Sequence, residues 1–157
     1  MDLILWRHAE AEDRAANDLA RALTGKGCKQ AAQMAKCLRA QLAGREVCVF
    51  ASQAIRSQQT AAALGWPVMI DARLNPDQAC AQSLLDVAQE VVQQAAGKVV
   101  ILVGHQPILG GVASLLLCGV ERSLNLKKAA VCWLQCRDGQ ADLRAMLTPE
   151  LLAKMEK

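Results

Sequence analysis

The stretch Leu3-Ile4-Leu5-Trp6-Arg7-His8-Ala9-Glu10 decides the fold. Four consecutive apolar residues predict a short strand that is buried on both faces of a sheet. The apolar run then stops at an arginine, a histidine and a glutamate. Open α/β sheets bind ligands at the carboxyl ends of their strands, so this strand is expected to deliver ionisable side chains to a site. The second histidine of the chain, His105, also follows an apolar run, Val99 to Gly104.

Segments with helical spacing alternate with the apolar strands along the chain. Capping residues and glycines mark their ends: Thr24 and Ser52 are expected to cap two of the helices, and Gly44 and Gly97 to follow two of them. The Asp138-Gly139 pair predicts a hairpin between antiparallel strands at a sheet edge. The predicted strands cover 47–51, 68–70, 99–103, 130–136 and 140–147, and the predicted helices cover 24–42, 53–64, 76–96, 108–117 and a short segment after Thr148.

This alternation predicts a largely parallel sheet covered by helices on both faces, which is a three-layer α/β/α sandwich with an antiparallel edge hairpin. Its 157 residues are expected to form a single domain, 1–157. A hydrophobic content of 53% with 21% charged residues excludes a globally disordered chain. A net charge of +3, the lack of tyrosine and a single phenylalanine argue against nucleic-acid binding.

Several features predict a cytoplasmic protein that needs no membrane. Only four consecutive apolar residues precede Arg7, so no signal-peptide core is expected in this stretch. The apolar stretch Ile108 to Val120 is too short to span a bilayer. The seven cysteines are an odd number without a Cys-x-x-Cys pair, so we expect reduced thiols and no metal or other cofactor. A monomer is the simplest expectation.

Cationic and hydrogen-bonding groups are expected to meet at one edge of the sheet. Arg7 and His8 close the first strand, Arg56 lies in the first turn of the helix after the second, and His105 closes a later one. Two arginines and two histidines with few carboxylates describe a pocket for a dianionic phosphoryl group, because guanidinium binds two phosphate oxygens at once. The chain has neither a glycine-rich nucleotide loop nor a carboxylate cluster for magnesium. Such a pocket needs a protein nucleophile, for which neutral His8 is suited.

The motifs in this order resemble the histidine phosphatase superfamily: Arg7-His8, Ser52-x-x-x-Arg56-x-x-Gln-Thr60-Ala61 and Gly104-His105-x-Pro107. Leu23-Thr24-x-x-Gly27 and the opening stretch are similar, more narrowly, to the SixA-type phosphohistidine phosphatases. The resemblance implies a phosphoglycerate mutase-like fold, with His8 as the phosphorylated nucleophile and Arg7, Arg56 and His105 as the clamp of the phosphoryl group. It also implies substrate-binding positions for Arg21, Asp18 and Ser52. Ala9 departs from the superfamily, in which glycine usually follows Arg-His.

A proton donor is harder to find in the sequence. Ester-cleaving members of the superfamily place a carboxylic acid opposite the nucleophile to protonate the leaving alkoxide, which gains about 10²–10⁴-fold from general acid catalysis. Here Glu10, Asp18 and Asp77 are candidates, and none is clearly placed. A phosphorylated imidazole leaves more easily, because its leaving group is much less basic. The missing acid therefore favours a phosphoramidate such as phosphohistidine.

We therefore expect a phosphatase that hydrolyses phosphohistidine on a signalling protein of a phosphorelay through a phospho-His8 intermediate. One alternative is a small-molecule phosphomonoesterase of the same superfamily that uses Asp77, Asp18 or Glu10 as its acid. Another is a phosphate-binding module whose catalysis has decayed. The expected partners are a histidine-phosphorylated protein as substrate and phosphate, or a phosphate analogue, in the pocket. Loops 11–23 and 119–128 are expected to contact the substrate.

Overall fold

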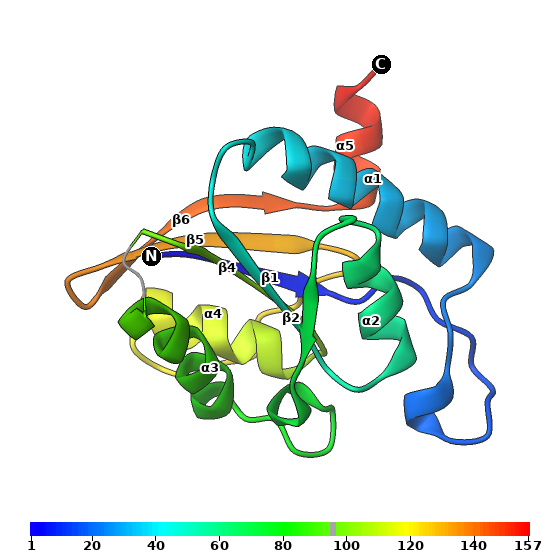
Figure 1. Ribbon diagram of the computed structural model, residues 1–157, viewed down its shortest axis with the longest axis horizontal. Helices are drawn as coiled ribbons and strands as arrows, with labels where there is room; N and C mark the ends of the chain where they lie inside the picture. The colour runs from blue at the N-terminus through cyan, green and yellow to red at the C-terminus, as the bar shows by residue number, and fades with distance from the viewer. Residues whose placement is uncertain (95–96) are drawn as a thin grey trace.

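The computed structural model describes residues 1–94 and 97–157 and contains one mixed sheet with helices on both faces (Figure 1). The sheet has the strand order β3-β2-β4-β1-β5-β6. Its strands are β1 (Asp2–Arg7), β2 (Val47–Ala51), β3 (Val68–Ile70), β4 (Val99–Gly104), β5 (Val131–Arg137) and β6 (Gln140–Leu147). The helices are α1 (Gly25–Gln41), α2 (Ile55–Ala62), α3 (Ala81–Gln94), α4 (Ile108–Cys118) and α5 (Pro149–Met155), with 3₁₀ turns η1 (Asp18–Ala20) and η2 (Ala72–Leu74).

Two apolar cores, one on each face of the sheet, make the three layers. The first contains residues of α1, α2 and α5, among them Met34, Ala61 and Leu152. They pack on the buried side chains that the central strands direct to this face of the sheet. The second contains residues of α3 and α4, such as Leu84 and Leu109. Alternate residues of β1 point into opposite cores, which explains why the whole run Leu3–Trp6 is apolar. The predicted α/β/α architecture is confirmed.

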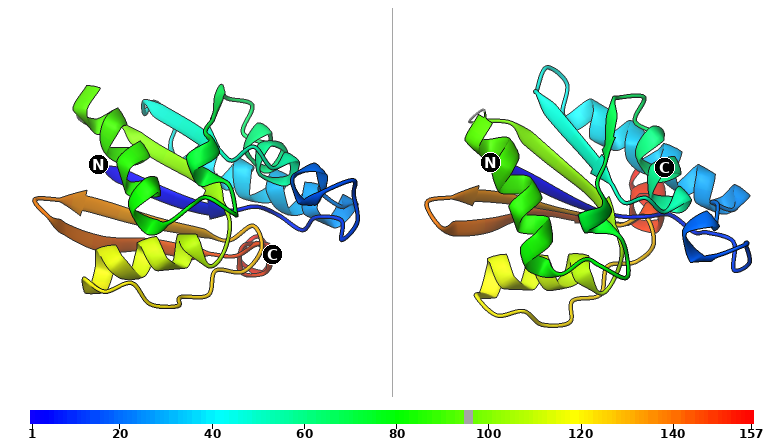
Figure 2. Two further views of the ribbon diagram at one scale, coloured as in Figure 1. Left: turned by 90° about the horizontal axis from the view of Figure 1, so that it is seen from below. Right: turned by 60° about the horizontal axis from the view of Figure 1, so that its bottom comes forward.

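The two central strands bring the two histidines side by side. Strands β1 and β4 pair in parallel with Arg7 opposite Gly104, so His8 and His105 are the next residues on the two strands. The backbone N–H of His8 donates to the carbonyl of Gly104 at 3.0 Å. The strand order therefore places both histidines at the carboxyl edge, beside the polar segment 11–23, which extends beyond the strand ends (Figure 2).

The predicted hairpin is confirmed at the β5–β6 edge of the sheet. These strands pair antiparallel, and β5 also pairs antiparallel with β1. Asp138 and Gly139 both have positive φ angles, 49° and 76°, which is the conformation that a two-residue type I′ hairpin needs.

Two helix starts differ from the predictions. Helix α2 begins at Ile55 after Ala54 rather than at Gln53. The hydroxyl of Ser52 lies 2.7 Å from Nε2 of His105 and accepts from the N–H of Ala54 at 3.3 Å, so its hydrogen bonds lie ahead of the first helical residue. Helix α3 begins at Ala81 rather than near Pro76. Asn75, the residue before the predicted helix start, makes two hydrogen bonds with Gln53 through its side chain and does not cap a helix at Pro76. The predicted end of this helix, at Ala96, lies outside the described residues.

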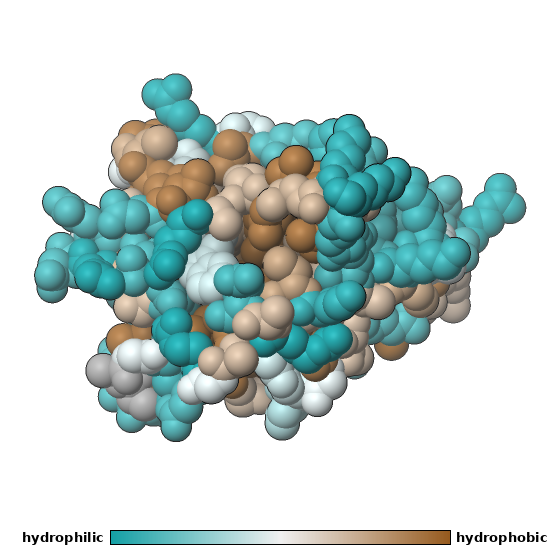
Figure 3. Space-filling model, turned by 90° about the horizontal axis from the view of Figure 1, so that it is seen from above, coloured by the Kyte–Doolittle hydropathy of each residue, from teal (hydrophilic) through white to brown (hydrophobic). Residues whose placement is uncertain are grey.

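The surface carries both polar and apolar areas. On the face that bears α5, hydrophilic residues lie around the periphery and apolar residues gather near the centre (Figure 3). Within residues 1–94 and 97–157, no helix has the length and apolar character needed to cross a bilayer.

Candidate functional site

His8 is buried at the end of β1, and one hydrogen bond fixes its tautomer. Its Nδ1 lies 2.7 Å from the carbonyl oxygen of Ala9. A carbonyl only accepts, so Nδ1 carries the proton and Nε2 keeps its lone pair. The pKa of His8 is lowered to about 4, chiefly by burial; the hydrogen bond to Ala9 opposes this shift, and the positive charges of Arg56, Arg7 and Arg21 add to it. His8 is therefore a neutral imidazole with a free Nε2 at neutral pH.

His105 faces His8, with its ring centroid 5.1 Å away. Its Nε2 lies 2.7 Å from the hydroxyl of Ser52 and 3.2 Å from that of Ser57. Nη2 of Arg56 lies 3.4 Å from Nδ1, and a guanidinium can only donate, so the proton is on Nε2 and points to the serines. Burial lowers the pKa of His105 to about 3, with the charges of His8 and Arg56 acting in the same direction.

Arg56, in the first turn of α2, is 3% exposed and is held by the 3₁₀ turn η1. Its guanidinium donates to the carbonyl of Asp18 at 2.7 Å and to the carboxylate of Asp18 at 3.0 Å. Arg21 donates to the same carboxylate at 3.1 Å. Burial raises the pKa of Asp18, but the hydrogen bonds from Arg56 and Arg21 outweigh this effect and leave the pKa below its usual value. Asp18 is therefore an ionised partner of two arginines.

Arg7 is anchored from the opposite side of the site. Its Nη1 donates to the carbonyl of Leu126 at 2.7 Å, and burial lowers the pKa of its guanidinium. Nε of Arg7 and Nε of Arg56 are buried and have no hydrogen-bond partner among the described residues. Buried donors are nearly always paired, so these arginines suit a site that receives an anion.

These side chains line a cavity of about 220 Å³ at the carboxyl edge of the sheet. The cavity brings together five of the predicted site residues: Arg7, His8, Arg21, Arg56 and His105. Its other lining residues are Ala11, Asp13, Pro76, Gln106 and Lys128. Asp13 and Lys128 were not singled out from the sequence, although both belong to the loops that were expected to contact the substrate. The cavity thus combines Arg7 and His8 from the end of β1, His105 from the end of β4, Arg56 from the start of α2 and Arg21 from the segment after η1, with Lys128 as a further basic residue.

Two predicted substrate-binding residues have different surroundings from those expected. Ser52 is fully buried, is not among the residues that line the cavity, and its hydroxyl lies 2.7 Å from Nε2 of His105, where it can orient that imidazole; a substrate-binding role for Ser52 stays a prediction. Asp18 lies beside the site, and its carboxylate forms ion pairs with Arg56 and Arg21. A carboxylate repels a phosphoryl dianion, so Asp18 fits the role of a holder of arginines better than that of a ligand.

The candidate acids do not gather opposite His8. Glu10 points into a neighbouring pocket, where it accepts from Thr24 at 3.1 Å and lies 3.8 Å from the ammonium of Lys26. Asp77 lines a separate hollow beside Asp18. The carboxylate that does line the His8 cavity is Asp13, for which no hydrogen bond or ion pair is found among the described residues. In the same part of the chain, no group of three or more His, Cys, Asp or Glu could hold a metal ion.

Thr60 connects the loop after β1 with α2. Its hydroxyl accepts from the backbone N–H of Ala9 at 3.0 Å and donates to the carbonyl of Arg56 at 2.7 Å. Ala9 is fully buried and is not among the residues with a positive φ angle, so this position does not require the glycine usual in the superfamily.

The chain was compared with protein families and with solved structures. Residues 3–77 match the model of the histidine phosphatase superfamily (branch 1). No curated protein sequence matches the chain. Among solved structures, the protein histidine phosphatase SixA complexed with tungstate has a TM-score of 0.84 at 24% identity, with 97% of this chain and 99% of that chain covered.

Phosphatases with other substrates share the fold. A mutant phosphoserine phosphatase from Entamoeba histolytica, in complex with phosphoserine, has a TM-score of 0.73 at 15% identity, covering 95% of this chain and 98% of that one. A mycobacterial glucosyl-3-phosphoglycerate phosphatase, in complex with VO₃, has a TM-score of 0.74 at 17% identity, covering 92% and 97%. Together with the family match, these likenesses confirm the resemblance of the chain to the histidine phosphatase superfamily and its phosphoglycerate mutase-like fold.

Proposed function

We propose that this protein is a phosphatase that hydrolyses phosphohistidine on a signalling protein through a phospho-His8 intermediate. The observation that carries the proposal is the state of His8: a neutral imidazole whose Nδ1–H is held by Ala9, so that Nε2 is the free nitrogen in a cavity lined by arginines. Nitrogen with a free lone pair is a competent nucleophile toward phosphorus.

The reaction proceeds in two displacements. In the first, Nε2 of His8 forms a bond to the phosphorus, and the P–N bond of the substrate breaks. The substrate ring takes the electron pair of that bond and leaves as neutral imidazole when its other nitrogen carries a proton. In the second, water attacks phospho-His8, which releases inorganic phosphate and regenerates the imidazole of His8.

Arg7, Arg56 and His105 surround the phosphoryl group in this proposal. The two guanidinium groups stabilise the charge on its non-bridging oxygens, because preorganised donors in a buried site lower the energy of the transition state. His105 is held at Nε2 by Ser52, so Nδ1 is the nitrogen it can present to a phosphoryl oxygen. An arriving dianion would stabilise the imidazolium form of His105, and a proton taken up from solvent at Nδ1 would convert this nitrogen from an acceptor into a donor.

The surroundings of the carboxylates support a phosphoramidate substrate. Asp18 is an ionised partner of two arginines, and Glu10 and Asp77 line other hollows, so the three predicted acids are not available to a leaving alkoxide. An imidazole leaving group does not need such an acid.

The decisive experiment measures turnover of a phosphohistidine-containing protein and traps the intermediate at alkaline pH, where phosphohistidine survives. Wild-type protein should release phosphate and carry label on His8, whereas His8→Ala should lose turnover by several orders of magnitude. Lys29→Ala, an exposed change on α1, is the control and should retain wild-type rates. Substantial turnover by His8→Ala would exclude the mechanism.

Asp13 favours a second candidate, a small-molecule phosphomonoesterase. Its carboxylate lines the His8 cavity and is the one acid of that lining. Comparing kcat/KM for amino-acid and sugar phosphates with kcat/KM for the phosphohistidine protein would separate the two functions. If esters are the substrates, Asp13→Asn should lower their kcat/KM by about 10²-fold or more. For phosphohistidine the same change should have little effect on turnover. Tight phosphate binding without any phospho-His8 would instead identify a binding module.

A further inference from the structure

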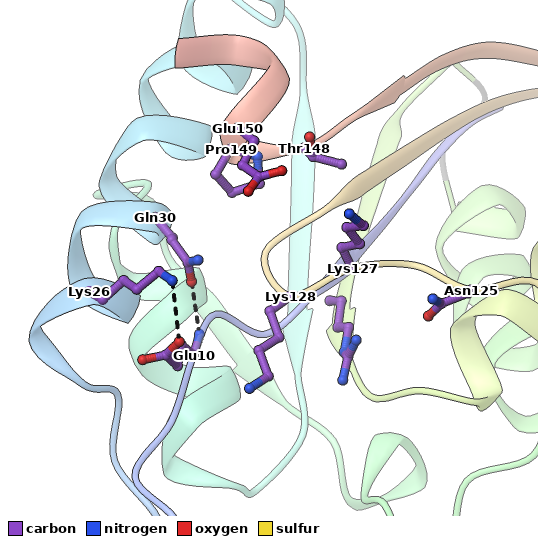
Figure 4. A pocket seen from close by; sticks show the side chains of 10 residues that line it. Glu10, Lys26, Gln30, Asn125, Lys127, Lys128, Thr148, Pro149 and Glu150 are labelled. Carbon is purple, nitrogen blue, oxygen red and sulfur yellow. Dashed lines mark hydrogen bonds and ion pairs between the residues drawn. The ribbon is translucent and has the colours of Figure 1, made fainter. Parts of the chain in front are cut away.

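A second pocket shares two lining residues with the His8 cavity. Figure 4 shows the side chains that line this second pocket. It has a volume of about 280 Å³ and is formed by the start of α1, the loop before β5 and the start of α5. Arg7 and Lys128 line both cavities. We call it the lysine pocket; its lining residues are Arg7, Glu10, Lys26, Gln30, Asn125, Lys127, Lys128, Thr148, Pro149 and Glu150.

The loop that carries Lys127 and Lys128 is fastened to the strand that carries His8. On one side of the two lysines, the carbonyl of Leu126 accepts from the guanidinium of Arg7 at 2.7 Å. On the other, Ala129 donates its N–H to the carbonyl of His8 at 3.1 Å and accepts from the indole of Trp6 at 3.0 Å. The backbone at the two lysines is thus held at a fixed place relative to His8, which reduces the entropy cost of ordering this loop for recognition.

The backbone of this loop is also strained next to the lysines. Ala129 has a φ angle of 61°, a left-handed conformation that a residue with a Cβ rarely adopts. Such strain costs about 1–3 kcal/mol and is found mostly where function requires a particular geometry.

The lysine pocket carries positive charge that ion pairs among the described residues do not neutralise. Lys26 is paired with Glu10. Lys127 and Lys128 are exposed, and neither has an ion-pair partner among residues 1–94 and 97–157. Figure 4 shows Glu10, Lys26 and Gln30 on one side of the pocket, Asn125, Lys127 and Lys128 on the other, and Thr148 to Glu150 at one end. Two carboxylates, of Glu10 and Glu150, disfavour a second dianion here but tolerate a group with a single negative charge.

We propose that the lysine pocket binds an acidic side chain of the phosphorylated protein, close in its sequence or fold to the phosphohistidine. The inference rests on the proposed function: a phosphohistidine in the His8 cavity would bring neighbouring side chains of the same protein to the lysine pocket, because Arg7 and Lys128 line both cavities. Exposed lysines act mainly by steering and selecting a charged protein partner, which is the effect expected of a docking contact. The site thus selects phosphohistidines that are flanked by Glu or Asp.

The test uses three synthetic phosphohistidine peptides that differ only in the residues flanking the phosphohistidine, which are Glu, Gln or Lys. For the wild-type protein at low ionic strength, kcat/KM should be about tenfold higher for the Glu peptide than for the Lys peptide, which corresponds to roughly 1.4 kcal/mol. The preference should shrink as salt is added, since exposed charges are screened.

Lys127→Glu should abolish or reverse this preference, because Lys127 lines the lysine pocket but not the His8 cavity. Lys36→Glu, an equal charge change at an exposed site on α1, is the matched control and should keep the wild-type preference. Equal kcat/KM for all three peptides, or an unchanged preference in Lys127→Glu, would overturn the inference while leaving the proposed function intact. Failure to hydrolyse any peptide would instead reject the proposed function, and the inference with it.

Discussion

Ala9 holds the predicted nucleophile through both of its backbone groups. Its carbonyl accepts from Nδ1 of His8 at 2.7 Å, and its N–H donates to the hydroxyl of Thr60 at 3.0 Å. The same hydroxyl donates to the carbonyl of Arg56 at 2.7 Å. A single buried hydroxyl therefore connects the backbone beside His8 with the backbone of Arg56, and the orientation of the imidazole depends on it.

Thr60→Val should damage both stability and turnover, whereas Thr60→Ser should not. Valine keeps the shape but leaves the N–H of Ala9 without its partner, which costs about 1–3 kcal/mol. Serine retains the hydroxyl and both hydrogen bonds. Urea unfolding measures the first effect and kcat for phosphohistidine the second. Equal unfolding free energies for the two variants would contradict this role of the hydroxyl.

Asp18 competes with an incoming anion for Arg56. Its carboxylate lies 3.0 Å from a guanidinium that is only 3% exposed, while Asp18 itself is largely exposed. Asp18→Asn removes the negative charge and keeps an oxygen that can accept from the arginine. We expect vanadate to bind this variant a few-fold more tightly, because one repulsive charge near the cavity is lost.

Inhibition of phosphohistidine hydrolysis by vanadate, measured at constant ionic strength, checks this prediction. Asp86→Asn is the control, because Asp86 is exposed on α3 and does not line the His8 cavity. Weaker vanadate binding in Asp18→Asn would mean that ordering of η1, rather than charge, is the main effect of Asp18.

The sequence predicts that Arg7, His8 and His105 reach the site at the ends of β1 and β4, because an apolar run ends where the strand leaves the core. It does not predict the surroundings of Ser52. The motif that contains Ser52 suggests either a helix cap or a substrate ligand, and the choice is made by His105, which is 53 residues away in the sequence. Lys128 and Asp13 belong to loops whose backbone paths depend on contacts with β1 and α2, so their places in the cavity follow only from the structure.

At the level of elements, the first turn of α1 packs directly on the backbone of the strand end. A Cβ added at Gly27 would collide with the carbonyl of Glu10, two residues after His8. That carbonyl also accepts from the N–H of Thr24, which caps α1 through Gly27. The residues Thr24 and Gly27 of the motif Leu23-Thr24-x-x-Gly27 thus hold the start of α1 against the loop that follows His8, the predicted nucleophile.

Gly27→Ala should push α1 away from this loop, whereas Gly25→Ala should be tolerated. Nothing lies within 4 Å of a Cβ added at Gly25, and Gly25 has no positive φ angle, so alanine there should be neutral or stabilise the helix by up to about 1 kcal/mol. Overpacking at Gly27 should cost about 1–3 kcal/mol and lower kcat. Thermal unfolding and turnover of the two variants check the pair, and similar behaviour of both would contradict the contact.

The starts of α2 and α3 were predicted less well than the strands, because a capping side chain can bond to a distant residue instead of to its own helix. Thr24 and Thr148 cap α1 and α5 through their own side chains, as their local sequence indicates. Ser52 and Asn75 have the same capping chemistry, but each is recruited by a partner far away in the sequence, His105 in one case and Gln53 in the other. Local propensity cannot distinguish the two situations.

At the scale of the whole molecule, the strand order makes the site. β4 is inserted between β2 and β1, so the carboxyl ends of these three strands are neighbours, with Arg7 at the end of β1, His105 after β4 and Arg56 in the helix that follows β2. Alternation of strands and helices predicts the layers and the hairpin, because both depend on local patterns. The order of parallel strands depends on how the crossovers pack on the sheet, and the sequence alone left it undetermined.

Two buried imidazoles should make the stability of the whole molecule depend on pH. The pKa of His8 is lowered from 6.5 to about 4 and that of His105 from 6.5 to about 3, mainly by burial. Between these values and 6.5 the unfolded chain binds more protons than the folded one, so the free energy of unfolding falls as the pH is lowered.

We therefore expect the protein to be most stable above pH 6.5 and to lose stability steadily as the pH is lowered from 6.5 to 4. Urea unfolding at pH 7.5, 6.5, 5.5 and 5.0 measures the loss, and proton titration of the two imidazoles by NMR identifies its source. His8→Gln removes one of the two groups and should flatten the profile, although it also removes the predicted nucleophile and is useful only for stability. A flat profile in the wild-type protein, or imidazole pKa values near 6.5, would mean that water reaches the His8 cavity more freely than its lining allows. In that case His8 would also be protonated at low pH, and the proposed attack of its imidazole on phosphorus would be lost there.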